Sequence, residues 1–202
     1  TKALAYVTRV GKLKGNPFPD WMQLTLGPGV ENGDPEMSWR RTVEVSETVL
    51  AFVAMQKPSH VALEDHAFNA QGSSIYQLAH LHGLIRRGLE LGGIQFEGPR
   101  VPFRLYTPQA IKGCATGKGN ADKTMMVIAA EKEGVPASSF GEPVCHNLAD
   151  AFWCAQLLRA EVLVRMGRLR PIDLSRRLQD VLAKRTEKRA PLLEQPFLGS
   201  AT

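Results

Sequence analysis

Two acidic residues stand at positions that suit chemistry better than packing. Glu64 ends the short apolar run that begins at His60, and Asp150 lies one turn inside a helix that begins near His146. A strand with a carboxylate at its carboxyl end presents that group beside loops. Mg²⁺ takes hard oxygen ligands, usually one or two carboxylates with water and substrate phosphates. The pair therefore predicts a divalent-metal site, and a surface salt bridge is the alternative for Glu64.

A glycine- and lysine-rich stretch over 115–123 lies between the two acids in the chain. Gly113 to Lys118 resembles a nucleotide-binding phosphate loop, but only three residues separate its glycines, and Gly119 stands where Ser or Thr should bind Mg²⁺. Glycines can still offer backbone N–H groups to a phosphate, and Lys118 and Lys123 add positive charge. Contact with a nucleic-acid backbone is therefore favoured over nucleotide hydrolysis, with an ordinary solvated loop as the alternative.

Asp150 stands among apolar neighbours that run from Leu148 to Trp153. An unpaired carboxylate in such surroundings is costly, so a metal ion, a lysine or a helix N-terminus should compensate its charge. Asn147 lies one turn earlier on the same side of the helix, and His146 is a second candidate for a ligand or a proton-transfer group. Either residue could equally cap the helix.

Apolar spacing and turn signals predict the elements that must position these residues. The predicted strands cover 2–10, 21–26, 60–64 and 101–106, and the predicted helices begin near 38, 74, 108, 125, 147 and 173. A meander-like start followed by strand–helix alternation is typical of an α/β domain with a mixed sheet.

Several residues are predicted to begin or end these helices. Ser38, Thr107 and Asp173 are the expected N-caps, with Pro108 at the first position of its helix. The pair Lys57-Pro58 should end the first helix. The tail after 190 is expected to be loose.

Composition fits a cytoplasmic globular protein. The chain has 202 residues, enough for one large domain or one domain with an extension, and no run approaches the ~20 apolar residues of a membrane span. Cys114, Cys145 and Cys154 show no CxxC spacing, which favours free thiols in a reducing compartment. The five histidines form no zinc pattern.

Positive charge gathers toward the end of the chain. The net charge is +5, and residues 159–188 hold nine Lys and Arg against four acids. Basic surface favours polyanionic partners through counterion release. A basic amphipathic helix is expected from Asp173 to about Lys188, and a merely solvated helix face is the alternative.

Several of these motifs together resemble the RuvC-like Holliday junction resolvases. The motifs are Glu64 after an apolar strand, Phe68 just beyond it, Lys112 and Lys123 around the Gly-rich loop, and Asn147-Leu-Ala-Asp-Ala151 opening an apolar helix. The sequence of 115–123 is closest to the bacteriophage and prophage forms. The resemblance covers about residues 1–160.

The resemblance implies an α/β, RNase H-like fold, in which helices flank a five-stranded mixed β-sheet, and a homodimer. It implies hydrolysis of phosphodiester bonds in Holliday junctions or other branched DNA, with two divalent ions, Mg²⁺ or Mn²⁺. Residues 1–166 would form the nuclease domain, with its first strand missing or truncated. Residues 167–202 would be a basic helical extension with a loose tail, which could contact DNA arms or the second subunit.

The resemblance also implies roles for individual residues. Glu64 and Asp150 would bind the metal ions and act in catalysis, and Asn147 would occupy the place of a further acidic or histidine ligand. Lys123 would neutralise the scissile phosphate. The residues that would contact DNA are Phe68, Lys112, Lys118 and Lys123.

Two departures from the family pattern leave other functions open. The first metal-binding Asp of the family is expected a few residues before Thr1, and Asn147 stands in place of an acid. Both departures are compatible with a non-catalytic module of the same fold that binds DNA junctions. A third possibility is an RNase H-like nuclease that acts on flaps or RNA–DNA hybrids.

Overall fold

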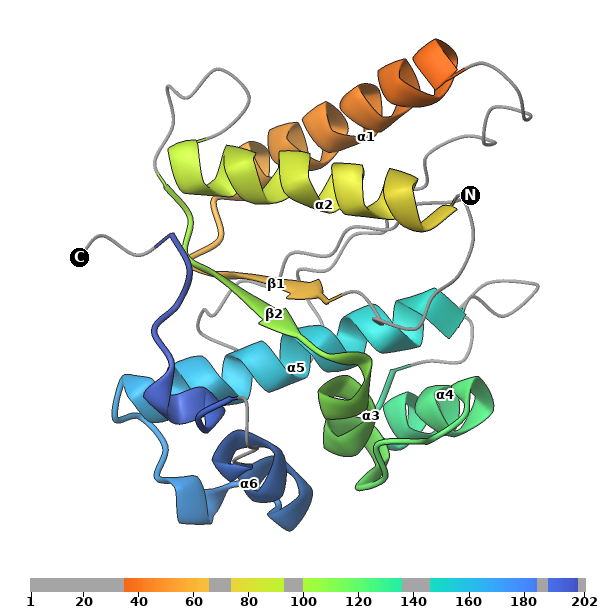
Figure 1. The fold of residues 1–202 in the computed structure, drawn as a ribbon. Helices are drawn as coiled ribbons and strands as arrows, with labels where there is room; N and C mark the ends of the chain where they lie inside the picture. Colours follow the sequence, from red (N-terminus) through yellow and green to blue (C-terminus); the bar gives the residue numbers. More distant parts are fainter. Residues whose placement is uncertain (1–34, 66–73, 93–99, 136–145, 185–188, 200–202) are drawn as a thin grey trace.

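The computed structural model describes residues 35–65, 74–92, 100–135, 146–184 and 189–199, and within them helices enclose a pair of strands (Figure 1). The elements in chain order are α1 Pro35–Gln56, β1 Val61–Glu64, α2 Ser74–Leu91, β2 Phe103–Tyr106, α3 Pro108–Thr116, α4 Lys123–Lys132, α5 His146–Arg165, η2 Pro171–Asp173, α6 Arg176–Ala183 and η3 Leu192–Glu194. The predicted α/β class is thereby confirmed. The predicted strands 2–10 and 21–26 lie outside the described residues, so the five-stranded sheet stays a prediction.

The two strands are parallel, with α2 in the connection between them. Their register pairs Val61 with Phe103 at one end and Glu64 with Tyr106 at the other. Successive side chains of a strand point to opposite faces of the sheet. Because Ala62 packs in the α5 cluster, Glu64 is expected on that same face, at the carboxyl end of β1.

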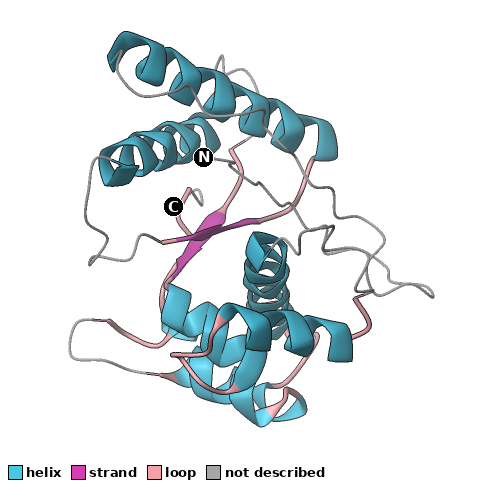
Figure 2. Ribbon diagram, turned by 90° about the vertical axis from the view of Figure 1, so that its right-hand side faces the viewer, coloured by secondary structure: helices cyan, strands magenta, loops and turns pink. Residues whose placement is uncertain are grey.

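Three layers follow from this alternation. α1 and α2 cover one face of the strand pair, and α5 covers the other with α3, α4 and α6 around it (Figures 1 and 2). The α1–α2 side is closed by Val49, Phe52, Val61, Leu89 and Phe103. The strand ends therefore lie between two separate apolar clusters.

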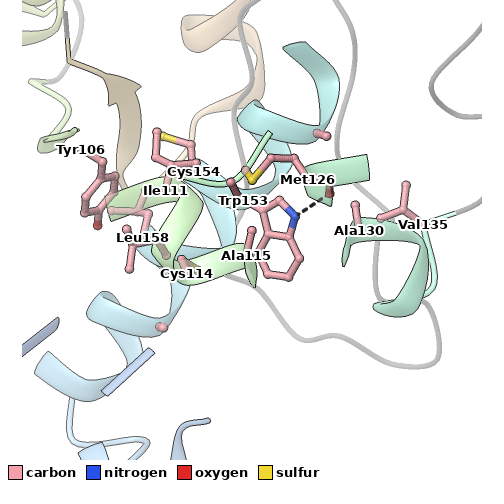
Figure 3. Close-up of a cluster of buried hydrophobic side chains, with 14 of the residues drawn as sticks. Tyr106, Ile111, Cys114, Ala115, Met126, Ala130, Val135, Trp153, Cys154 and Leu158 are labelled. Carbon is pink, nitrogen blue, oxygen red and sulfur yellow. Dashed lines mark hydrogen bonds between the residues drawn. The ribbon is translucent and has the colours of Figure 1, made fainter. Parts of the chain in front are cut away.

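The larger apolar cluster fixes α3, α4 and α5 around Trp153 (Figure 3). The indole is buried, and its Nε1 donates a hydrogen bond to the carbonyl of Met126 at 3.2 Å. Burial of such a side chain contributes about 3 kcal/mol, and the bond satisfies its one polar atom. This packing holds the first turns of α5 against α4, which is the region that carries Asp150.

Side-chain caps begin α3 and α4. Thr107 accepts a hydrogen bond from the N–H of Ala110 at 3.2 Å, and Pro108 takes the first helical position, as predicted. Asp122 accepts one from the N–H of Met125 at 2.8 Å, so α4 begins at Lys123. A carboxylate or hydroxyl at this position satisfies one of the free N–H groups of the first turn.

Three boundary predictions were wrong. Ser38 lies inside α1, which begins at Pro35, where a missing N–H costs nothing. The predicted loop 115–123 starts later, because α3 continues through Thr116. Asp173 ends the turn η2, where it binds Arg170, and α6 begins after Ser175 and ends at Ala183.

Residues 191–199 pack on the sheet, contrary to the expected loose tail. Phe103 and Leu198 exchange two backbone hydrogen bonds of 2.9 and 3.0 Å. Phe197 lies under the guanidinium groups of Arg104 and Arg165, 4.7 and 4.8 Å from its ring centre. Apolar and cation–π contacts therefore hold this segment in place. Its local sequence alone had indicated an unstructured tail.

The remaining expectations concern thiols and membranes. Cys114 and Cys154 are buried and free, as predicted, whereas Cys145 lies outside the described residues. Among the helices that the structure describes, none is both long and apolar enough to cross a membrane.

Candidate active site

The fold brings Glu64 and Asp150 together from different layers. Glu64 is exposed at the carboxyl end of β1, yet the surrounding protein raises the pKa of its carboxyl group, first through desolvation and then through the negative charge of Asp150. A like charge acts this way only at short range. The two predicted acids therefore share one site.

Asp150 is half-buried near the start of α5. Desolvation raises its pKa as well, and the positive charges of Lys123, Lys112 and His146 oppose that rise. The apolar setting that made this residue conspicuous in the sequence is thus real. Its charge is compensated by basic groups from neighbouring elements, as the cost of an unpaired buried carboxylate requires.

Two lysines complete the cluster from the α3 and α4 side. Lys112 is half-buried on α3, and Lys123 is exposed as the first residue of α4. Each of them also lowers the pKa of Glu64. Two carboxylates with two adjacent ammonium groups form a site that can hold a divalent cation and a phosphate side by side.

The thiols beneath the cluster do not take part in this chemistry. Cys154 lies one turn after Asp150, and burial raises its pKa well above the usual range, reinforced by Glu64. Burial likewise raises the pKa of Cys114 to about 12. A thiol is a nucleophile or metal ligand only as thiolate, so both remain inert near neutral pH.

The donor set fits a hard cation. Desolvation disfavours the charged forms of Glu64 and Asp150, and a bound divalent ion would reverse that penalty. In the described part of the chain no group of three or more His, Cys, Asp or Glu forms a metal cage. Mg²⁺ commonly needs only one or two carboxylates, because water and substrate phosphates complete its shell. His146 adds a buried Nδ1 that has no hydrogen-bond partner among the described residues.

The other predicted site residues are less central. Lys118 is exposed in the turn after α3, and it is not among the charges that act on the two carboxylates. Asn147 is the second residue of α5, one turn before Asp150, and its side chain is outside the described atoms. Phe68 lies outside the described residues.

The turn after α3 offers fewer backbone donors than predicted. The N–H of Gly117 donates to Gly113, that of Lys118 to the hydroxyl of Thr116, and that of Ala121 to Lys118. These three groups are not available to a phosphate. A phosphate contact here is therefore left to the lysine side chains and to the N–H groups of the turn that these bonds do not use.

Sequence patterns missed a second charged cluster between the sheet and α5. Arg104 and Glu161 are only 4% and 0% exposed and form a two-pronged ion pair. Glu161 also accepts hydrogen bonds from the hydroxyl of Tyr106 at 2.7 Å and from Nε of Arg165 at 2.9 Å. The residue spacing could have indicated that both side chains are buried. Arg104 lies two residues before Tyr106, on the same face of the strand, and Glu161 lies one helical turn after Leu157, on the buried side of α5.

No protein-family model matches the chain. A curated relative, the crossover junction endodeoxyribonuclease RuvC of Corynebacterium diphtheriae, is 27% identical over 116 residues, which cover 53% of this chain and 67% of the relative. The chain is thus similar to a RuvC over about half of its length.

Two solved structures are also similar to this chain. The Thermus thermophilus RuvC structure is 21% identical, with a TM-score of 0.49, over 83% of this chain and 97% of the other. The T. thermophilus RuvC in complex with a Holliday junction substrate is 20% identical, with a TM-score of 0.44, over 74% and 80% of the two chains.

Proposed function

We propose that this protein is a divalent-metal-dependent endonuclease that cuts Holliday junctions or other branched DNA. One observation carries the proposal: the charge of Asp150 on α5 acts on Glu64 at the end of β1, and Lys112 and Lys123 act on both acids. The likeness to a crossover junction endodeoxyribonuclease supports the choice of reaction and substrate.

The proposed reaction is hydrolysis of a phosphodiester bond. A water oxygen forms a bond to phosphorus, the bond from phosphorus to the 3′ oxygen breaks, and the products carry a 5′-phosphate and a 3′-hydroxyl. Lys123, exposed at the start of α4, neutralises the scissile phosphate, and Lys112 holds the adjacent backbone from α3. Glu64 and Asp150 supply carboxylate oxygens to the ions. Their lysine neighbours favour the ionised forms by opposing the rise in pKa that desolvation causes.

When bound, Mg²⁺ or Mn²⁺ lowers the pKa of the attacking water and neutralises the charge that develops on the phosphate oxygens. The Trp153 packing and the β1–β2 register hold the two carboxylates at the carboxyl end of β1. There they would bind the ions, at a place that a DNA phosphate can reach from solvent. Asn147 enters as a further ligand on the resemblance alone, and His146 at the start of α5 is a second candidate.

The finer features of the proposal rest on the resemblance to the family. They are the five-stranded RNase H-like sheet, a homodimer with one site per subunit, two ions per site, a bacteriophage-type origin and a nuclease domain over 1–166. Phe68 and Lys118 are proposed to contact the DNA around the branch point. A dimer suits a four-way junction because two symmetric cuts are needed to resolve it.

Cleavage of matched DNA substrates tests the proposal. The protein is incubated with a four-way junction, a flap, a linear duplex and an RNA–DNA hybrid of shared sequence, with Mg²⁺, with Mn²⁺ and with EDTA. We expect metal-dependent cuts in the junction, with 5′-phosphate ends that a ligase can rejoin. A protein that leaves both the junction and the flap uncut in either metal would overturn the proposal.

The same panel separates the alternatives. Tight junction binding without cleavage would indicate the non-catalytic module, and preferential cutting of the hybrid would indicate an RNase H-like activity on RNA. The Glu64→Gln variant is the control for contaminating nucleases, because it should bind the junction and leave it intact.

A further inference from the structure

A second cleft lies on the other side of α3 from the carboxylates. It has a volume of about 790 Å³, and residues of α3, α6 and the segment that leads to η3 line it. Gln109, Ala110 and Gly113 of α3 line it, whereas Lys112 of the same helix acts on Glu64 and Asp150. One short helix therefore separates the candidate active site from the cleft.

Basic residues predominate among the charged residues of the cleft. Its lining includes Arg176, Arg177, Lys184 and Arg189, against the single acid Asp180. All but Arg189 come from the basic stretch 159–188. The structure turns that composition into a concave basic surface.

The basic residues differ in how firmly contacts within the protein hold their side chains. Arg177 is fixed, because it donates to the carbonyl of Ala115 at 2.9 Å, pairs with Glu133 at 2.5 Å and stacks over Trp153. Arg176 makes only an exposed pair with Asp180 at 3.1 Å, and such pairs contribute little. Lys184 is exposed and has no ion pair within the described residues. Arg176 and Lys184 can therefore turn toward an anion at little cost.

The cleft begins beside the candidate active site. Arg189, which lines it, pairs at 3.5 Å with Asp65, the residue that follows Glu64. α3 has nine residues, which correspond to about 13 Å and thus to about four base-pair steps along a DNA strand. Because only this short helix separates the two places, a DNA strand bound at the carboxylates would need to extend by only a few nucleotides to reach the cleft.

We propose that the cleft between α3 and α6 binds the phosphate backbone of one DNA arm, a few nucleotides from the bond that is cut. This inference rests on the proposed function, which names DNA as the partner. The sequence left open whether α6 contacts DNA or the second subunit, and the inference assigns it to DNA. The positive lining and the adjoining carboxylate site favour DNA.

The test compares two variants that remove the same charge. Arg176→Gln/Lys184→Gln neutralises the available residues of the cleft. Arg87→Gln/Arg168→Gln neutralises two exposed residues that do not line it. Junction affinity is measured from 50 to 200 mM salt, and cleavage is measured in a single turnover at saturating protein. Thermal melting of each variant reports its folding, and Lys184→Gln alone is a second, milder variant that breaks no ion pair within the described residues.

We expect the cleft variant to bind the junction about 10-fold more weakly and to lower the slope of log affinity against log salt by about 2. Its cleavage rate at saturation should equal that of the wild type, and the control variant should change affinity less than threefold. Lys184→Gln should lower the slope by about 1. Equal affinities and slopes for the cleft and control variants, with cleavage intact, would overturn this inference and leave the proposed function standing.

Neutral methylphosphonates locate the contact. Replacement of phosphates two to six nucleotides from the cut should weaken binding by the wild type and have little added effect on the cleft variant, because both changes remove the same contact. Additive losses would overturn the inference. A wild type that neither binds nor cuts the junction would overturn both proposals, whereas binding without cleavage, with the same charge effects, would support the cleft and overturn only the nuclease.

Discussion

Two charged clusters lie between the strand pair and α5, and they differ in kind. At the strand end, Glu64 faces the like charge of Asp150, and the pKa of each is raised, with desolvation as the largest cause. Deeper in the same layer, Glu161 accepts hydrogen bonds from Arg104, Tyr106 and Arg165 and is fully buried. In the first cluster the charges of Lys112 and Lys123 only partly offset the cost of the two acids. In the second, hydrogen bonds from the protein itself satisfy the carboxylate.

The difference teaches how to tell a ligand site from a structural one. A buried charge with a complete set of donors fixes the packing, and breaking it destabilises the protein. Acids held near each other beside solvent are instead costly to the fold and useful to a cation. Arg104 also donates to the carbonyls of Gln195 and Pro196, so the structural cluster ties the end of the chain to β2.

Removing a carboxylate of the first cluster should have the largest effect on activity. Glu64→Gln or Asp150→Asn should lower single-turnover junction cleavage on the order of 10³-fold or more, since a bound ion contributes several kcal/mol to the transition state. Junction binding and thermal stability should be nearly unchanged, because removing one acid relieves repulsion. The matched control is Glu131→Gln, an exposed acid on α4. Cutting at the wild-type rate by either variant would show that the site is misassigned.

Breaking the second cluster should have the largest effect on stability. Glu161→Gln leaves the buried guanidinium of Arg104 without a counter-charge and should lower the free energy of unfolding by about 3–5 kcal/mol. Urea denaturation measures this loss, with Glu131→Gln again as the control. A loss below about 1 kcal/mol would contradict the assigned structural role. At a temperature where the variant stays folded, its cleavage should exceed that of Glu64→Gln.

Replacing a lysine of the first cluster should have an intermediate effect. Lys123→Gln removes a charge-assisted contact to the phosphate and should lower kcat/KM for the junction by about 10- to 100-fold. Lys132→Gln, at the other end of the same helix, is the control. If the two variants lose activity equally, Lys123 acts only through the general charge of the protein.

The smallest effect concerns pH and the second cluster. His60 packs against Phe197, with ring centres 4.6 Å apart, and desolvation by burial lowers its pKa, opposed by the charge of Glu161. The unfolded chain therefore binds a proton more readily, and folding stability should fall as the pH drops below about 6.5. Urea denaturation at pH 7.5 and 5.5 measures this, and His60→Asn should reduce the difference by at most about 1 kcal/mol. An unchanged pH dependence in that variant would show that His60 titrates normally.

Local signals in the sequence predicted much of the described fold. The cap at Thr107 with Pro108, the end of α1 before Lys57, and the stop of α2 at Gly92 depend on residues within one turn. Such signals predict where elements begin and end. They failed at Ser38 and Asp173, where a nearby residue also fits the role.

The candidate site could be predicted in its parts but not in its arrangement. Glu64 and Asp150 each stood out, one by its place at a strand end and one by its apolar neighbours. The resemblance joined them, and the tertiary structure placed Lys112 and Lys123 beside them through α3 and α4.

The sequence by itself determined the strand ending in an acid, the helix carrying a second, and the basic character of residues 159–188. Only the tertiary structure decided that Arg104 and Glu161 meet in the core, that the end of the chain packs on β2, and that α6 and α3 enclose a basic cleft. The physical reason is the distance along the chain over which each kind of interaction acts. Helix and strand signals act over a few residues, whereas ion pairs and clefts join segments distant in the chain, and no periodicity records such pairing.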